Sequence, residues 1–150
     1  MGTNYYMLTR NKKIKDKYFN LYDDYELTDV PKFGYEIHIC KKSGGWKTLF
    51  QSHDNAYKSV EELEKFIKKH QKSFIFYDEN LEMYSPEEFI EKMKYQDRDK
   101  DGNIYKKYGT DEPLINHEEY FEQHRWEYPY MDIKYWQDKD GYDFTEGDFS

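Results

Sequence analysis

The residues best spaced for chemistry form an acidic loop that matches part of a calcium-binding pattern. Asp97, Asp99 and Asp101 place oxygen ligands at positions one, three and five, and a glycine follows at position six, as in the EF-hand loop. The twelfth position should supply a bidentate glutamate, but it is Tyr108. The Asp-Lys-Asp-Gly stretch of this loop recurs at 138–141. This recurrence favours a plain turn at both places, with a bound cation as the alternative.

A second cluster is basic and surrounds a Ser-Gly-Gly sequence. Ammonium groups and successive backbone amides can hold a phosphate group. The residues that would make this contact are His38, Lys41, Lys42, Ser43 and Trp46. The chain lacks the G-x-x-x-x-G-K-[ST] spacing of a phosphate-binding loop, and no strand-to-helix transition follows. A solvated turn is therefore the preferred interpretation, and contact with a small ligand or phosphate is the alternative.

The five histidines predict no metal site. His117 and His124 are seven residues apart, which is about 10 Å along a helix and too far for both to ligate one ion. His38 and Cys40 lie two residues apart on the same face of one predicted strand, roughly 6–7 Å from each other. Activation of the Cys40 thiol by the His38 imidazole is therefore not expected. No nucleophile and base stand out as a pair. We therefore expect no cofactor and no catalytic residue, and we favour a protein that is not an enzyme.

Residues 34–51 should form the β-hairpin that carries the basic cluster. Apolar and polar residues alternate on both sides of the Ser-Gly-Gly tip, which is typical of two strands joined by a tight turn. In the first strand Ile37 and Ile39 are predicted on one face, and His38 and Cys40 on the opposite face.

The remaining elements follow from capping boxes, periodicity and turn residues. Predicted strands cover residues 4–10, 74–77, 81–84, 131–136 and 142–144, with a short strand or surface segment at 25–30. Predicted helices cover residues 60–71, a segment beginning at Ser85, and 117–125. Residues 11–20 are a predicted loop, and residues 95–113 are a predicted loop, with a short hairpin as the alternative. This order predicts a single α+β domain over residues 1–150, with a mostly antiparallel sheet of hairpins and two or three helices packed on one face.

Composition predicts an aromatic core and an acidic second half. The chain has 30 Phe, Trp and Tyr residues but only 18 Leu, Ile and Val. Residues 1–72 carry 14 basic and 10 acidic side chains, whereas residues 73–150 carry 9 basic and 21 acidic ones. Such a charge distribution repels nucleic acid and attracts basic surfaces. The single cysteine and the lack of an apolar leader or membrane-spanning run predict a soluble, cytoplasmic protein.

Four short segments resemble a known group of proteins. They are the opening M-G-T-N-Y-Y, the hairpin I-H-I-C-K-K-S-G-G-W at 37–46, the S-P-E-E-F sequence at 85–89, and the ending D-G-Y-D-F at 140–144 with its D-F-S terminus. The chain resembles small uncharacterised proteins of bacteriophages and prophages that open with M-G-T-N-Y-Y and carry an I-H-I-G-K-S-S-x-G-W-like hairpin. In this chain Cys40 replaces the usual glycine and Lys42 replaces a serine. The resemblance implies a phage origin and the cytoplasm of a bacterial host, but no activity.

These observations lead to one functional hypothesis and one alternative. The hypothesis is a phage interaction protein that binds a basic host protein, such as an antiphage-defence or nucleic-acid-handling protein, and inhibits or redirects it. The expected contact residues are aromatic or acidic: Tyr105, Tyr108, Tyr120, Trp126, Tyr128, Tyr130, Asp132 and Trp136. The alternative is a small-ligand or nucleotide-binding domain, with or without hydrolase activity, whose site lies near the 38–46 hairpin.

Overall fold

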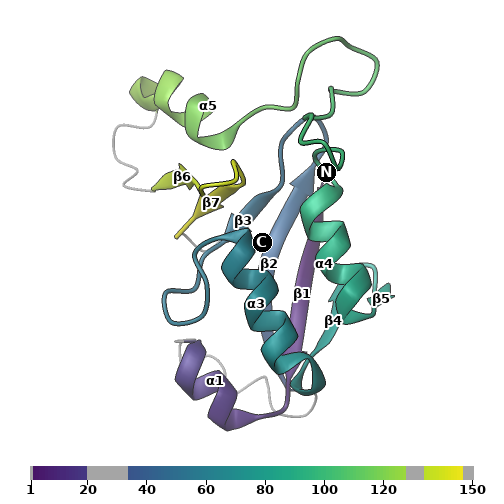
Figure 1. Cartoon of the computed structure of the whole chain (residues 1–150). Coiled ribbons are helices and arrows are strands. Elements are labelled where there is room, and N and C mark those ends of the chain that lie inside the picture. The colour runs from purple at the N-terminus through teal and green to yellow at the C-terminus, as the bar shows by residue number, and fades with distance from the viewer. Residues whose placement is uncertain (1, 20–33, 128–133, 147–150) are drawn as a thin grey trace.

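Seven strands form one sheet in the computed structural model, which describes residues 2–19, 34–127 and 134–146 (Figure 1). The strands are β1 (Gly2–Thr9), β2 (Tyr35–Ser43), β3 (Leu49–Gln51), β4 (Ile75–Asp78), β5 (Met83–Tyr84), β6 (Tyr135–Gln137) and β7 (Asp143–Thr145). The helices are α1 (Lys12–Tyr18), α3 (Val60–His70), α4 (Pro86–Tyr95) and α5 (His117–Gln123), with 3₁₀ turns η1 (Gln71–Ser73) and η2 (Arg125–Glu127).

The sheet has the order β5-β4-β1-β2-β3-β7-β6. All neighbouring strands are antiparallel except β3 and β7, which pair in parallel. The predicted α+β class, the hairpin over 34–51 and the β4–β5 hairpin are therefore confirmed. The single parallel pair brings the last described strand beside the central hairpin, about 95 residues later in the chain.

A β-bulge in β2 changes which face Cys40 occupies. Tyr5 pairs with Cys40 and Tyr6 pairs with His38, so Ile39 is an extra residue in the ladder. A bulge of this kind breaks the strict alternation of side chains. Cys40 is consequently buried in the core together with Ile37 and Ile39. The prediction that Cys40 shares a face with His38 is wrong, because strict period-2 counting cannot register the added residue.

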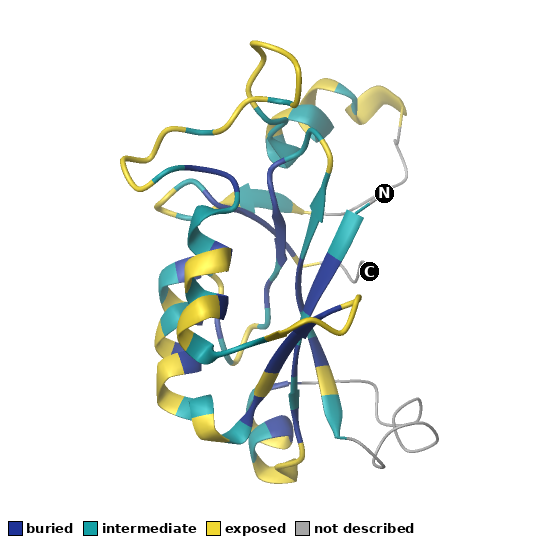
Figure 2. Cartoon of the chain, turned by 90° about the vertical axis from the view of Figure 1, so that its right-hand side faces the viewer, coloured by how far each residue is buried: buried dark blue, intermediate teal, exposed yellow. Residues whose placement is uncertain are grey.

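Helices α3 and α4 each begin directly after a serine that caps the first turn. Ser59 and Ser85 accept hydrogen bonds from the Glu62 and Glu88 backbone N–H groups, and α4 has the complete capping box. Both helices lie side by side on one face of the sheet (Figure 2). The predicted loop at 11–20 is wrong: Asn11 caps α1, which spans seven residues. The residues predicted as a segment at 25–30 lie outside the described ranges.

The core between these helices and the sheet is mostly aromatic, as expected from composition. Its buried rings belong to Tyr5, Phe19, Phe50, Tyr57, Phe66, Phe74, Phe76, Phe89, Tyr142 and Phe144. Ring pairs such as Phe76 and Phe89, whose centroids are 5.0 Å apart, add to the free energy gained by burial. Within the described residues, no helix is both long and apolar enough to cross a membrane.

The central strand β1 provides a direct test of this core. Met7 is fully buried, whereas its neighbour Leu8 points to the opposite face and is partly exposed. Met7→Ala should lower the free energy of unfolding by about 2–5 kcal/mol, because it leaves a cavity in a closely packed interior. Leu8→Ala is the matched control and should cost clearly less. Equal losses in urea denaturation would contradict the assignment of the two faces.

Candidate functional site

The three aspartates of the calcium-like loop are held in different ways. The buried Asp97 carboxylate accepts hydrogen bonds from the Thr48 backbone N–H (2.7 Å) and hydroxyl (2.9 Å). The Lys42 ammonium also lies 3.1 Å from Asp97 Oδ1. Asp99 instead accepts from the backbone N–H groups of Asp101 and Asn103. Among the described residues, no group of three or more His, Cys, Asp or Glu side chains is arranged to hold a metal ion.

Both Asp-Lys-Asp-Gly sequences form turns, as the preferred interpretation predicts. Gly102 donates its N–H to the Asp99 carbonyl at 3.1 Å, and Gly141 donates to the Asp138 carbonyl at 3.0 Å. The two glycines have φ of 89° and 83°, a left-handed conformation that favours glycine. In each turn the first aspartate also accepts hydrogen bonds from later backbone N–H groups.

The basic hairpin residues predicted for ligand contact are partly used inside the protein. Lys42 donates to the Trp46 carbonyl and pairs with Asp97. His38 lies with Nε2 2.8 Å from Asn4 Oδ1 and Nδ1 2.8 Å from Gln51 Oε1. Lys41 and Ser43 are half-exposed. Lys42 and His38 are therefore already held by contacts within the protein.

A hollow of about 370 Å³ lies elsewhere in the molecule. Residues from the start of α3, the end of α4 and the two Asp-Lys-Asp-Gly turns line it, and none of the 38–46 hairpin residues does. Its charged side chains include both signs, and Lys94 pairs with Glu64 at 3.0 Å across its wall. This mixed and internally paired lining gives the hollow no clear ligand preference.

A buried ion pair joins the central hairpin to the carboxy-terminal strands. Lys47 Nζ lies 3.0 Å from Asp143 Oδ1 and donates to the Gly141 carbonyl at 2.5 Å. The second oxygen of Asp143 accepts the His117 backbone N–H at 2.8 Å. His117 Nε2 in turn lies 2.9 Å from the Lys47 carbonyl oxygen, to which it donates. Each charged partner is therefore both neutralised and hydrogen-bonded, as buried charges require.

Stacked rings extend this connection to α5. The His117 ring stacks on Trp46 with centroids 4.7 Å apart, and Tyr120 meets Trp46 edge-on at 4.8 Å. Tyr135 of β6 stacks on Phe121 at 4.2 Å. We call Trp46, Lys47, His117, Tyr120 and Asp143 the anchor cluster.

The anchor cluster holds a segment that we call the acidic lobe, residues 99–127, at one end of the molecule (Figure 1). The segment carries eight acidic and four basic residues. Three of its rings are well exposed: Tyr108 fully, Trp126 by 74% and Tyr105 by 46%. Tyr105 and Tyr108 lie in the loop before α5, whereas Trp126 lies in η2 after it. The exposed rings therefore occupy two parts of one lobe.

The other predicted contact residues differ in their surroundings. Tyr120 is half-buried against Trp46, and its ring also stacks on His124 at 4.0 Å. Trp136 packs on the core, 5.9 Å from the Phe144 ring. Tyr128, Tyr130 and Asp132 lie outside the described residues. Sequence periodicity does not separate these cases, because Tyr105, Tyr108 and Trp126 lie outside the α-helices and Trp136 lies in a strand of only three residues.

Burial keeps the Cys40 thiol and the Tyr77 hydroxyl in their protonated forms. Burial raises the pKa of the Cys40 thiol well above its ordinary value. Burial also raises the pKa of the Tyr77 hydroxyl, which bonds to the Glu36 carboxylate. A thiol and a phenol held in their protonated forms are poor nucleophiles.

The chain matches none of the protein-family models, curated proteins or solved structures with which it was compared.

Breaking the buried pair should destabilise the protein strongly. Lys47→Met leaves the Asp143 carboxylate without its cation, which should cost about 3–5 kcal/mol in unfolding free energy. Lys65→Met is the control, because its partner Glu61 lies on the surface of α3 and such pairs contribute under about 1 kcal/mol. A Lys47→Met loss as small as the control, measured by denaturant unfolding, would contradict the role given to the pair.

Stability should also depend on the protonation of His117. Burial lowers the pKa of its imidazole below the ordinary 6.5, and burial lowers the pKa of His70 too. The unfolded chain therefore binds more protons just below pH 6.5, so the free energy of unfolding should fall as pH drops from about 7.5 to 5.5. His117→Gln keeps a donor but removes the titration, and should flatten this slope. An unchanged slope would contradict the proposed cause.

Proposed function

We propose that this chain is a non-enzymatic interaction protein that binds a basic partner through the acidic lobe. The observation that carries the proposal is the exposure of large aromatic rings amid excess negative charge. Within the lobe, residues 111–127 contain six acidic side chains and a single arginine. Trp126, 74% exposed, lies in this stretch. Aromatic side chains are the commonest energetic anchors of protein interfaces, and the surrounding carboxylates favour a partner of opposite charge.

The anchor cluster supports this proposal by fixing the base of the lobe. A binding surface gains affinity when its parts are ordered before the partner arrives. The Lys47 backbone N–H donates to the Ile115 carbonyl at 2.9 Å, and Ile115 donates to the Gly45 carbonyl at the same distance. With the ion pair and the stacked rings, these bonds connect the start of α5 to the central sheet. The lobe therefore projects from a fixed base.

The resemblance to phage proteins indicates that the proposed partner belongs to a bacterial host. In a bacterial host, an acidic protein can act by occupying the basic surface of another protein. We infer that the partner is a basic host protein, for example one that handles nucleic acid or defends against phage, and that binding inhibits or redirects it. Long-range attraction between the two surfaces would speed association at low ionic strength.

The proposal is tested by capture from a bacterial lysate with matched variants. The wild-type chain should retain a protein of basic isoelectric point, and retention should fall as salt rises from about 50 to 500 mM, since screening shortens the range of the attraction. Trp126→Ser with Tyr108→Ser should weaken binding of the captured protein about 30-fold, as expected for interface anchors worth about 2 kcal/mol. Biolayer interferometry measures both effects.

The charge control removes the same number of carboxylates from two places. Glu119→Gln with Glu122→Gln, in the lobe, should slow association, whereas Asp16→Asn with Asp54→Asn, on exposed sites outside the lobe, should have little effect. If both pairs act equally, net charge and not the lobe governs binding. If no protein is retained at low salt, or if the Trp126→Ser, Tyr108→Ser variant binds the captured protein as tightly as wild type, the proposed function is wrong.

A further inference from the structure

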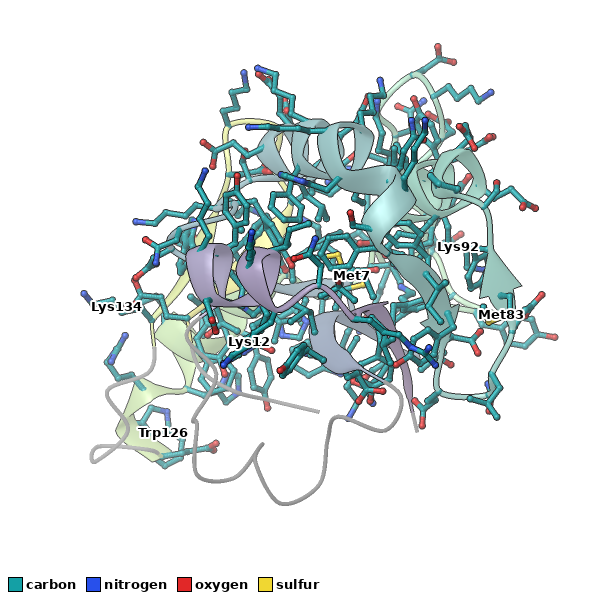
Figure 3. All side chains as sticks on the ribbon, turned by 90° about the horizontal axis from the view of Figure 1, so that it is seen from below. Met7, Lys12, Met83, Lys92, Trp126 and Lys134 are labelled. Carbon is teal, nitrogen blue, oxygen red and sulfur yellow. The ribbon has the colours of Figure 1, made fainter. Side chains whose placement is uncertain are left out.

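The exposed large hydrophobic side chains of the described residues fall into two chemically distinct groups. The aromatic ones, Tyr105, Tyr108 and Trp126, belong to the acidic lobe. The aliphatic ones are Ile75, Leu81 and Met83, exposed by 48%, 76% and 58%. We call these three residues, in and beside the β4–β5 hairpin, the aliphatic edge. Met83 and Trp126 lie on opposite sides of the molecule (Figure 3), so the two groups form separate surfaces.

Leu81 has a backbone conformation that is unfavourable for leucine. It has φ of 65°, and among the described residues it is the one non-glycine residue with positive φ. Left-handed backbone suits glycine or asparagine, whereas leucine is strained there. The turn is built by its neighbour Asp78, whose Oδ1 accepts the N–H groups of Asn80 and Glu82. Leu81 thus combines a strained backbone with an exposed apolar side chain, and neither feature stabilises the native state.

The strand that follows Leu81 forms an end of the sheet. β5 is the terminal strand and pairs with β4 alone. Asp78 donates its backbone N–H to the Glu82 carbonyl at 3.1 Å, and antiparallel ladders alternate along the strand. The backbone N–H and C=O of Met83 therefore point away from β4. An exposed sheet edge with this pattern can accept one more strand.

Charge around the aliphatic edge selects the chemistry of that strand. Residues 73–91 contain six acidic side chains and no Lys or Arg. Glu79, Glu82 and Glu87 are exposed around the hairpin and at the start of α4. A second copy of this chain would bring the same negative charges together across the edge, which disfavours self-pairing. A strand that carries basic side chains meets the opposite charge.

We propose that the aliphatic edge binds an extended, basic peptide segment of a partner protein, which adds a strand beside β5. The segment exchanges backbone hydrogen bonds with Met83. Its apolar side chains contact Ile75, Leu81 and Met83, and its Lys or Arg side chains face the surrounding glutamates. This surface is separate from the acidic lobe, so the inference goes beyond the proposed function and either can fail alone.

The test uses a fluorescein-labelled KVKVKVK peptide and fluorescence anisotropy at fixed ionic strength. Leu81→Asn with Met83→Ser leaves the net charge unchanged and should weaken binding about tenfold, since the apolar contacts are lost. The lobe variant Trp126→Ser with Tyr108→Ser should leave the affinity unchanged. The peptide KVKPKVK, which has the same charge but lacks a central N–H, and the acidic EVEVEVE should both bind at least tenfold more weakly.

Two further readouts separate a binding role from a structural one. The single variant Leu81→Asn should unfold at the same temperature as wild type or higher, because asparagine relieves the left-handed strain. Hydrogen exchange at the Met83 amide should slow when the peptide binds. The proposal is overturned if the edge variants bind KVKVKVK normally, if KVKPKVK binds equally well, or if the bound peptide becomes helical. Sedimentation showing self-association that Leu81→Asn abolishes would also overturn it, because the occupant would then be a second copy.

Discussion

The buried pair of Lys47 and Asp143 is the interaction on which the outer half of this structure depends. Moving each charge out of water costs free energy, and this desolvation cost is offset only because the other charge and several hydrogen bonds are in place. The pair also has a topological effect, because Asp143 begins β7, the strand that enters the sheet in parallel beside β3. The same carboxylate receives the His117 N–H at the start of α5. One ion pair thus fixes a strand, a helix and the base of the acidic lobe.

The second organising feature is the separation of aromatic side chains into interior and surface sets. Rings on the helix-covered face of the sheet fill the core, where edge-on and stacked contacts compensate for the scarcity of aliphatic residues. In the lobe, Tyr120 packs against Trp46 and Phe121 against Tyr135, whereas the rings of Tyr105, Tyr108 and Trp126 are exposed. The aliphatic residues Leu81 and Met83 are exposed at the other end of the sheet. The two surfaces therefore offer different chemistry on one fold.

Local signals predicted most of the elements, because local chemistry determines them. Ser59 and Ser85 cap α3 and α4, with the complete capping box at Ser85, and the glycine-containing turns appear in the structure. Two predictions failed. One added residue in β2 places Cys40 in the core, and the short helix α1, whose only start signal is Asn11, was predicted as a loop. The anchor cluster was not predictable from sequence spacing. Lys47 and Asp143 lie 96 residues apart, and each looks like an ordinary surface charge.

The central claim is that the acidic lobe is an outward contact surface on a fixed base. Hydrogen–deuterium exchange of the chain, alone and with its captured partner, tests this claim most directly, because it locates the contact without any substitution. The account predicts slower exchange within residues 99–127 on binding, and little change in the core strands β1 and β2. Protection confined to α3 and α4, or no protection within residues 103–127, would contradict it.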